Sequence, residues 1–444
     1  MSYPVDAPAM VRRLNAHLIL QLVREQPGQS LSSLTRRSGL RQSDLAPILT
    51  DLKGFGLLTE GPVGGVDGAG GEEGLYFNSK AMKVIGLTLG PSKLQAALTD
   101  LETDVLTRWS GPLDAGSSRQ RRWEVILEQA AEVVESLLAA AQLNPDQITG
   151  LGVSLPGQMD VSRGISHVIH TLNGWRDVPV VPWLEDRLGI RTFLEHNVRA
   201  MALGEWRFGS ARGAQNFLAV KLGTGIDAAV MVDGRLVRGA SGHAGELGHV
   251  NVVPSGGPSC TCGSTGCLDA MSSGHAVARR ARERLRTGAA SLLTDSDFNP
   301  GGEVTAQVVH RAAVAGDELA ASVFAEAGWY LGLALASAVN LLNPERIVIG
   351  GGLANAWDYL APQVHSAIES KSLRLSRDSV TIVPATLGPD APARGAAAIV
   401  VDRFFGVGEA FGFEAAMWET LVPGMAGGRA QRRSKGKGGG GSKA

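Results

Sequence analysis

Hydrophobic positions near the start of the chain recur every three or four residues, which is the period of an amphipathic helix. They are Val11, Leu14, Leu18 and Leu22. We expect this helix to end near residues 27–28, where a proline and a glycine follow one another. A second, short helix is expected over residues 31–38, because Ser30 can cap its first turn and Gly39 can end it.

A third helix is expected from about Asp44 to Phe55, followed by a glycine-rich loop over residues 61–74 and a strand-like run at 75–77. Two short helices around a tight turn, and then a β-hairpin, are the components of a winged helix-turn-helix. We therefore assign residues 10–79 to a DNA-binding domain of this type. A small helical cap or a dimerisation lobe would show the same order of elements. The residues expected to meet DNA, at the start of the recognition helix, are Arg41, Gln42 and Ser43.

The charges of this region favour only modest affinity for DNA. Residues 1–80 hold eight basic and eight acidic residues, and the wing at 64–74 carries three acids and no lysine or arginine. Asp44 is an acid on the expected DNA face, unless it serves as the N-cap of the third helix. Pro47 fits a straight helix only if that helix begins at Asp44.

The rest of the chain repeats one pattern twice. An apolar strand runs into a glycine turn and two further strands over residues 84–109, and again over residues 217–237, where Asp233-Gly234 predicts a hairpin turn. A long helix and a buried strand follow each of these runs, at 121–141 and 148–153 and at 319–342 and 347–349. Two such β-β-β-α-β units predict a duplicated, two-lobed α/β fold with a cleft between the lobes. Glycine turns in such a cleft can offer backbone N–H groups to phosphate oxygens.

A histidine and all three cysteines of the chain lie close together in one loop-rich stretch. They follow the order H-x10-C-x-C-x4-C, as His249, Cys260, Cys262 and Cys267. Four such ligands suit a closed tetrahedral zinc site, and Gly263 and Gly266 allow the tight backbone that it needs. Three buried free thiols are the alternative. With no open ligand position, the zinc is expected to be structural.

Composition restricts where the protein works. The chain is 44% hydrophobic and 19% charged with a net charge of −1, so any contact with nucleic acid must come from a local patch. The start lacks the pattern of a signal peptide, and the apolar stretch 331–342 is too short to cross a bilayer. Few, clustered cysteines suit a reducing cytoplasm. Residues 427–444 carry six basic residues among glycines and are expected to be a disordered, solubilising tail.

Residues 246–249 and 260–269 together resemble the zinc signature of the ROK family (repressors, open reading frames and sugar kinases). Residues 222–225 look like that family's second phosphate loop, and residues 343–352 look like its nucleotide-side strand and turn. The resemblance runs from about residue 80 to 403, and the N-terminal helices match the repressor branch. It implies an actin/hexokinase-like ROK domain, which we assign to residues 80–426.

The resemblance also implies a sugar pocket and two former nucleotide loops. In the pocket, Thr171 and Asn173 are alternatives for one position. The implied ligand-binding residues are Thr171, Asn173, His196, Asn197, Glu246, His249 and Asp269. The implied vestigial nucleotide loops contain Gly90, Gly223, Thr224, Gly225, Gly350 and Gly351.

Three departures from the family pattern argue against phosphorylation. Thr88 and Pro91 replace an aspartate and a glycine of the first phosphate turn, D-x-G-G-T-K. Asn197 stands where the family carries its general base, and an amide cannot accept the proton of the attacking hydroxyl; this loss alone is expected to cost roughly 10²–10⁴-fold in rate. Asp227 follows the second phosphate loop, where we expect its charge to lie near ATP phosphates.

These observations predict a sugar-responsive transcriptional regulator, a repressor of carbohydrate metabolism, that is not an enzyme. Its expected partners are operator DNA, a sugar or sugar-phosphate effector and further copies of itself, as a homodimer or homotetramer, since two half-sites need two recognition helices. We expect it in the cytoplasm and not at a membrane. The alternatives are an ATP-dependent sugar kinase, a sugar-binding pseudokinase that has lost DNA binding, and a domain whose pocket binds nothing.

Overall fold

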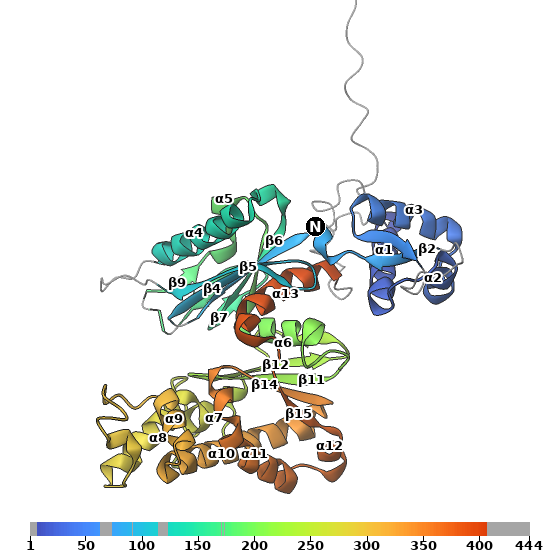
Figure 1. Ribbon diagram of the computed structural model, residues 1–444. Helices are drawn as coiled ribbons and strands as arrows, with labels where there is room; N and C mark the ends of the chain where they lie inside the picture. Colours follow the sequence, from blue (N-terminus) through green and yellow to red (C-terminus); the bar gives the residue numbers. More distant parts are fainter. Residues whose placement is uncertain are drawn as a thin grey trace, which may run out of the picture.

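The structure, a computed structural model, describes residues 7–62, 73–90, 92–113, 123–169, 171–172 and 174–405. Figure 1 shows a small N-terminal module beside one α/β lobe, with a second α/β lobe below that lobe in the view. We call these the N-terminal module, lobe I and lobe II.

The N-terminal module has three helices and then a two-stranded antiparallel hairpin. The elements are α1 (Ala7–Glu25), α2 (Leu31–Ser38), α3 (Gln42–Gly54), β1 (Leu58–Pro62) and β2 (Glu73–Phe77). Ser30 caps α2 by accepting a hydrogen bond from the Ser33 N–H at 3.3 Å, and Gly39 ends it at a φ of 69°. The limits and both caps of α2 agree with the prediction.

Two details of the module differ from the prediction. The buried face of α1 contains Ala16, Ile19, Leu20 and Val23, each 0% exposed, together with the predicted Leu22, whereas Val11 is 55% exposed. The helix contacts α2, α3 and β2.

The third helix begins earlier than predicted. α3 starts at Gln42 with Arg41 as its N-cap residue, so Asp44 lies within the first turn and is not the cap. Pro47 therefore lies inside the helix, where it removes the hydrogen bond to the Ser43 carbonyl. Ser43 and Pro47 are both exposed, so water can satisfy that carbonyl.

Lobe I is built on a five-stranded sheet in the order β10-β6-β3-β4-β5. Its strands are β3 (Lys83–Leu89), β4 (Lys93–Thr99), β5 (Val105–Pro112), β6 (Ile148–Leu155) and β10 (Thr192–His196). The lobe also contains α4 (Trp123–Ala141), α5 (Val180–Leu188) and a small sheet of β7 (Gln158–Asp160), β8 (Ile165–Val168) and β9 (Arg176–Val178). Helices α6 (Asn197–Phe208) and α13 (Ala391–Phe405) lie between the two lobes' sheets (Figure 1).

Helix α13 approaches the sheet of lobe I unusually closely. A Cβ atom on Gly152 would lie 1.9 Å from the Ala396 carbonyl oxygen, and one on Gly86 would lie 2.0 Å from that of Ala393. Only glycine fits at these two positions. This contact fixes α13 and, through it, α6 beneath the strands that lead to the cleft.

Lobe II repeats the sheet of lobe I, in the order β13-β12-β11-β14-β15. Its strands are β11 (Phe217–Leu222), β12 (Ile226–Val232), β13 (Arg235–Val237), β14 (Arg346–Gly350) and β15 (Thr381–Pro384). Its helices are α7 (Leu268–Ser272), α8 (Gly274–Arg286), α9 (Ala306–Val314), α10 (Glu318–Leu342), α11 (Trp357–Lys371) and α12 (Arg374–Ser379). Short 3₁₀ turns are η2 (Ser79–Ala81), η3 (Pro145–Gln147), η4 (Leu247–His249), η5 (Leu292–Thr294), η6 (Gly352–Ala356) and η7 (Gly388–Asp390).

The predicted internal duplication is confirmed by these two sheets. In each, the first strand pairs antiparallel with the second and parallel with the strand that follows the long helix. The predicted hairpin turn is present as well, since Asp233 and Gly234 have φ angles of 50° and 68°. Both values suit the type I′ turn that joins twisted antiparallel strands.

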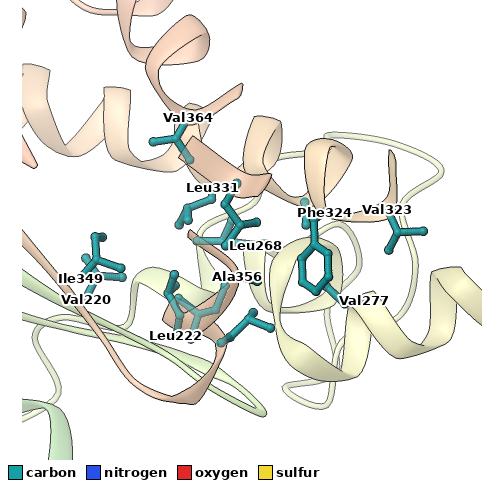
Figure 2. Packing of buried hydrophobic residues seen from close by; sticks show 14 of the residues in the cluster. Val220, Leu222, Leu268, Val277, Val323, Phe324, Leu331, Ile349, Ala356 and Val364 are labelled. Atoms are coloured by element: carbon teal, nitrogen blue, oxygen red, sulfur yellow. The ribbon is translucent and has the colours of Figure 1, made fainter. Parts of the chain in front are cut away.

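The largest hydrophobic cluster lies in lobe II around α10. Figure 2 shows Phe324 and Leu331 of α10 among Val220, Ile349 and Val364 from the neighbouring strands and α11. With 25 residues, α10 is by length and composition able to cross a membrane, and it is longer than the apolar stretch that we judged too short. Its most apolar window is 61% buried inside the protein, as expected for a core helix.

The N-terminal module is packed against lobe I rather than held by a linker alone. One hydrophobic cluster contains Leu20 and Leu52 from the module together with Leu101, Phe193 and Phe404 from lobe I and α13. Beside it, Ser79 Oγ donates to Asp100 Oδ2 at 2.6 Å. Helix α13 and the helices of the module therefore share one hydrophobic cluster.

Candidate functional site

A narrow cavity lies in the cleft where β10 and α6 meet β12 and the loop before η4. Its free volume is about 10 Å³, close to what one water molecule needs, so a monosaccharide requires the loop to move. The lining residues are Gly157, Met159, His196, Val198, Arg199, Asp227, Ala228, Gly242, His243, Ala244, Gly245 and Glu246. Of the residues expected in a sugar pocket, the structure brings His196 and Glu246 together here.

His196 ends β10 and caps α6. Its Nδ1 accepts a hydrogen bond from the Val198 N–H at 3.4 Å. Burial, with Lys221 and Arg199 nearby, lowers the pKa of His196, although Asp227 and Glu195 oppose the shift. The imidazole is therefore neutral near pH 7, and its proton lies on Nε2 because Nδ1 is the acceptor.

A buried ion-pair network holds the same part of the cleft. Glu195 is 1% exposed; its Oε1 accepts from the His196 backbone N–H at 2.9 Å and from Arg199 Nη1 at 3.3 Å, and its Oε2 accepts from Arg238 Nη2 at 3.1 Å. Arg199 also donates to the carbonyls of Gly242 and Ala244. The arginine thereby ties the start of α6 to the loop that covers the cavity.

Sequence reasoning did not single out Arg199 and Arg238. Arg199 occupies the last position of the E-N-D-x-N segment, so the signal was an arginine where the family carries an asparagine. Arg238 follows β13 and lies 43 residues from Glu195 in the chain. No local pattern indicated that pairing.

Asn197 is the first residue of α6, and its Oδ1 is buried without a hydrogen-bond partner among the described residues. A buried acceptor without a partner costs about 1–3 kcal/mol. A ligand hydroxyl that donates to this oxygen would recover that energy.

Asp227 faces the cavity. It lines the cavity beside His196 and Glu246, and it stands directly across the β11–β12 ladder from Lys221. Burial lowers the pKa of Lys221, and the carboxylate of Asp227 opposes that shift. The charge of Asp227 is therefore placed among the sugar-side groups and is partly balanced by a lysine.

The other described candidates for sugar binding, Asn197, His249, Asp269 and Thr171, do not line the cavity. Asp269 Oδ1 accepts from the Ile226 N–H at 2.8 Å, next to the loop at residues 223–225, and burial raises the pKa of its carboxyl. Thr171 is exposed and does not line the cavity. Asn173 lies outside the described residues.

The former nucleotide loops are closed by their own hydrogen bonds. The Gly90 N–H donates to the Lys93 carbonyl at 2.7 Å, and Pro91 lies outside the described residues. In the second loop, the Gly223 N–H donates to the Gly225 carbonyl at 2.9 Å, while the Gly223 carbonyl accepts from the Gly274 N–H at 2.8 Å. The Gly223 N–H of this loop and the Gly274 N–H at the start of α8 therefore already donate within the protein.

The third loop, at residues 350–352, packs against the end of β11. Gly351 has a φ of 90°, and a Cβ atom there would lie 2.3 Å from the Leu222 carbonyl oxygen. Gly350 lies against the Met201 sulfur of α6. Thr224 lies in the loop before β12, where its carbonyl accepts from the His275 N–H at 3.5 Å.

The four predicted metal ligands converge. The ligand atoms of His249, Cys260, Cys262 and Cys267 all lie within 4.8 Å of one another. The Cys262 and Cys267 sulfurs are 3.7 Å apart, and Cys260 Sγ is 3.6 Å from His249 Nδ1. Two sulfurs bound to one tetrahedral zinc at about 2.3 Å lie about 3.8 Å apart, so the donor set fits a metal ion.

The same histidine also connects the metal ligands with the cavity. Its Nδ1 faces the cysteines, and its Nε2 lies 3.9 Å from Glu246 Oε2. A metal on Nδ1 would fix the orientation of this ring and hence of the Glu246 carboxylate.

The residues expected to meet DNA lie at the exposed start of α3. Arg41 is 82% exposed at its side chain, and its Nε donates to Asp44 Oδ2 at 2.9 Å. Gln42 and Ser43 are exposed beside it. Most of the expected wing, residues 63–72, lies outside the described residues.

The duplicated sheets, the cleft between them and the Cys₃His loop define an actin/hexokinase-like, two-lobed domain of the sugar-kinase class. The ROK family matches residues 84–403, and the chain belongs to this family.

The relatives fall into two groups. A glucokinase of Halalkalibacterium halodurans is 33% identical over 312 residues, which are 70% of this chain and 92% of that protein. A xylose repressor of Bacillus spizizenii is 25% identical over 400 residues, which are 89% of this chain and 97% of that protein. The crystal structure of a ROK family transcriptional regulator, a homologue of Escherichia coli Mlc, covers 94% of this chain and all of its own, with a TM-score of 0.80 and 26% identity. The long matches to regulators support the repressor branch of the family.

Proposed function

We propose that the protein is a sugar-responsive transcriptional repressor whose ROK domain binds a sugar or sugar derivative without phosphorylating it. The observation that carries this proposal is Asn197. An amide stands at the family's general-base position, and its buried Oδ1 has no partner among the described residues. It can accept a hydrogen bond from a sugar hydroxyl but cannot remove a proton from it.

The sugar would be held by groups that the cavity already presents. Neutral His196 supplies an Nε2–H donor, and the carboxylates of Asp227 and Glu246 supply acceptors for hydroxyl groups. Arg199 holds the loop at Gly242–Ala244 over the cavity, so sugar entry would require those two hydrogen bonds to lengthen.

The two former phosphate loops of the cleft do not favour phosphoryl transfer. Thr88 provides no carboxylate at the first turn, and the Gly223 N–H of the second loop donates to the Gly225 carbonyl. Because catalysis of phosphoryl transfer rests on positioning and charge, these losses add to that of the base.

The metal is proposed to be a structural zinc held by His249, Cys260, Cys262 and Cys267, because four protein ligands leave no open position. Its role would be to hold the loop at 249–267 in its folded conformation and to orient His249 beside Glu246.

DNA recognition is proposed for the N-terminal module, through Arg41, Gln42 and Ser43 at the start of α3. The longer matches, to regulators, extend over this module, whereas the glucokinase match spans 70% of the chain. We place the domain boundary between residues 79 and 80 and propose a homodimer or homotetramer in the cytoplasm. The end of the ROK domain at 426 and the tail at 427–444 lie outside the described residues.

A second candidate function, an ATP-dependent sugar kinase, is favoured by the 33% identity with a glucokinase. A coupled assay of ADP release over a panel of sugars separates the two. The repressor predicts saturable sugar binding without turnover, and sugar-dependent ADP release by the native protein would favour the kinase. A sugar-binding pseudokinase that has lost DNA binding would bind the sugar but not its own upstream DNA.

A further inference from the structure

A second, larger cavity opens on lobe I and shares no lining residue with the sugar pocket. Its volume is about 440 Å³, within the range of small-molecule sites in proteins. Its walls come from the turn between β7 and β8, the start of α5, and β10, with one residue each from the end of β13 and the end of α13.

Three of the four charged side chains that line this cavity are arginines. Arg163, Arg238 and Arg403 line it, against one carboxylate, Glu185. Glu185 Oε1 is already engaged, since it accepts from the Thr192 N–H at 2.9 Å. The three arginines come from positions that are far apart in the chain, so the fold, and not a local basic run, brings them together.

Apolar residues make up much of the remaining wall. Val181 and Pro182 from the first turn of α5 and Phe193 and Leu194 of β10 line the cavity together. A ligand for this cavity therefore has an anionic group for the arginines and an organic body for the apolar walls.

We propose that this cavity is a second small-molecule site, which takes an organic phosphate. Guanidinium groups bind phosphate oxygens through paired, charge-assisted hydrogen bonds, and several arginines suit a dianion better than a single carboxylate does.

Arg238 connects this site with the sugar pocket. Its Nη2 lies 3.1 Å from Glu195 Oε2, and the other oxygen of that carboxylate accepts from Arg199, which holds the loop at Gly242–Ala244. A phosphate at Arg238 competes with Glu195 for the guanidinium and leaves Arg199 to balance that carboxylate. The Arg199 guanidinium is then drawn towards Glu195, which weakens its hydrogen bonds to the Gly242 and Ala244 carbonyls. That regulatory consequence rests on the proposed function of the pocket, but binding of the phosphate does not.

The binding test is a calorimetric titration of the full-length protein with phenyl phosphate, and with inorganic phosphate as the ligand that lacks an organic body. We expect saturable binding, tighter for phenyl phosphate, and a loss of roughly tenfold or more in affinity in the double variant Arg163→Gln/Arg403→Gln. Arg176→Gln is the matched control, because Arg176 is an exposed arginine on β9 outside the cavity. Arg163→Gln alone, at an exposed position, serves if the double variant does not fold.

A variant of the sugar pocket, Glu246→Gln, shows which of the two cavities binds the phosphate. Unchanged phosphate affinity in this variant supports the proposal. A change of phosphate affinity in Glu246→Gln but not in the double variant would overturn it, as would the absence of saturable binding to the native protein. Neither titration contains DNA or sugar, so its failure is distinct from a failure of the proposed function.

Hydrogen exchange of backbone amides measures the coupling between the phosphate site and the loop over the sugar pocket. Phenyl phosphate should speed exchange of the amides of residues 242–245 in the native protein and leave it unchanged in the double variant. Binding without any change at these amides would overturn the coupling through Arg238.

Discussion

The side-chain hydroxyls of Thr88 and Ser154 share a hydrogen bond of 2.8 Å between the parallel strands β3 and β6. Thr88 is 6% exposed, and its hydroxyl is directed into the sheet, where the Ser154 carbonyl also lies 3.4 Å from its Oγ1. The strand position that resembles the acid of the family's first phosphate turn is thus occupied by a neutral group with its own partners. The cleft has lost a charge there, and the loss is built into the packing of lobe I.

Restoring the general base alone is therefore not expected to restore a kinase. In Asn197→Asp, we expect no sugar-dependent ADP release above the native level, because Thr88 still leaves the first turn without a carboxylate. A coupled assay with the same sugar panel measures this. A rise of about 10²-fold in the single variant would contradict our account of the first turn.

Sugar binding is expected to depend on Glu246 and not on Thr171. Removing one charged hydrogen-bonding partner of a ligand costs about 1.5–3 kcal/mol, so Glu246→Gln should weaken sugar binding by roughly tenfold or more. Thr171→Ala is the control, because Thr171 is exposed and does not line the cavity. Calorimetry on both variants tests the assignment, and equal losses in the two would show that the pocket lies elsewhere in the cleft.

The sequence predicted the elements that depend on local signals. The caps Ser30 and Gly39, the Asp233-Gly234 turn and the cysteine loop each follow from residues within a few positions of one another. The position of Asp227 and the pairing of Arg238 with Glu195 could not be found in this way, because β-sheet register and lobe packing decide them. For α1 the pattern was right at Leu22, which is buried, and wrong at Val11, which is exposed, for the same reason. Its stripe at Ala16, Ile19, Leu20 and Val23 is selected by what packs against the helix.

Removal of the metal should unfold the loop at residues 249–267 and abolish sugar binding together. We expect one equivalent of zinc in the native protein by mass spectrometry of metals, and loss of it in Cys267→Ser, since three ligands do not complete the tetrahedron. Glu246→Gln should keep the zinc. This variant therefore distinguishes weaker sugar binding caused by loss of the metal from weaker binding caused by loss of a sugar contact. Full zinc content in Cys267→Ser would contradict the ligand set.

His17 of α1 should make the protein less stable as the pH falls. Burial, with Arg207 nearby, lowers the pKa of His17 from 6.5 to about 4. Below about pH 6.5 the unfolded chain binds a proton at this residue that the folded protein does not bind until about pH 4. The free energy of unfolding therefore has its full value above pH 6.5. It falls as the pH is lowered from 6.5 towards 4, by about 3 kcal/mol.

Chemical denaturation between pH 4 and pH 7.5 measures this effect. His17→Gln should show a shallower decline in the free energy of unfolding than the native protein, and the exposed His365→Gln should match the native slope. Identical slopes in the native protein and His17→Gln would show that the module does not hold His17 neutral.

Asp44 is expected to weaken DNA binding by occupying Arg41. The ion pair at 2.9 Å lies at the exposed start of α3, so Asp44→Asn frees a guanidinium and removes a negative charge from the DNA face. We expect tighter binding and a steeper salt dependence in this variant, and weaker binding in Arg41→Ala, by fluorescence anisotropy at several salt concentrations. If neither variant changes the affinity or the salt slope, α3 does not meet DNA through its first turn.

The most direct test of the account is binding of the full-length protein to its own upstream DNA, with and without each member of a sugar panel, alongside a measurement of ADP release in the same samples. We predict that the protein binds the DNA, that one sugar or sugar derivative shifts the affinity, and that this sugar is not phosphorylated. Absence of DNA binding even at low salt, or phosphorylation of the sugar that binds, would contradict the central claim.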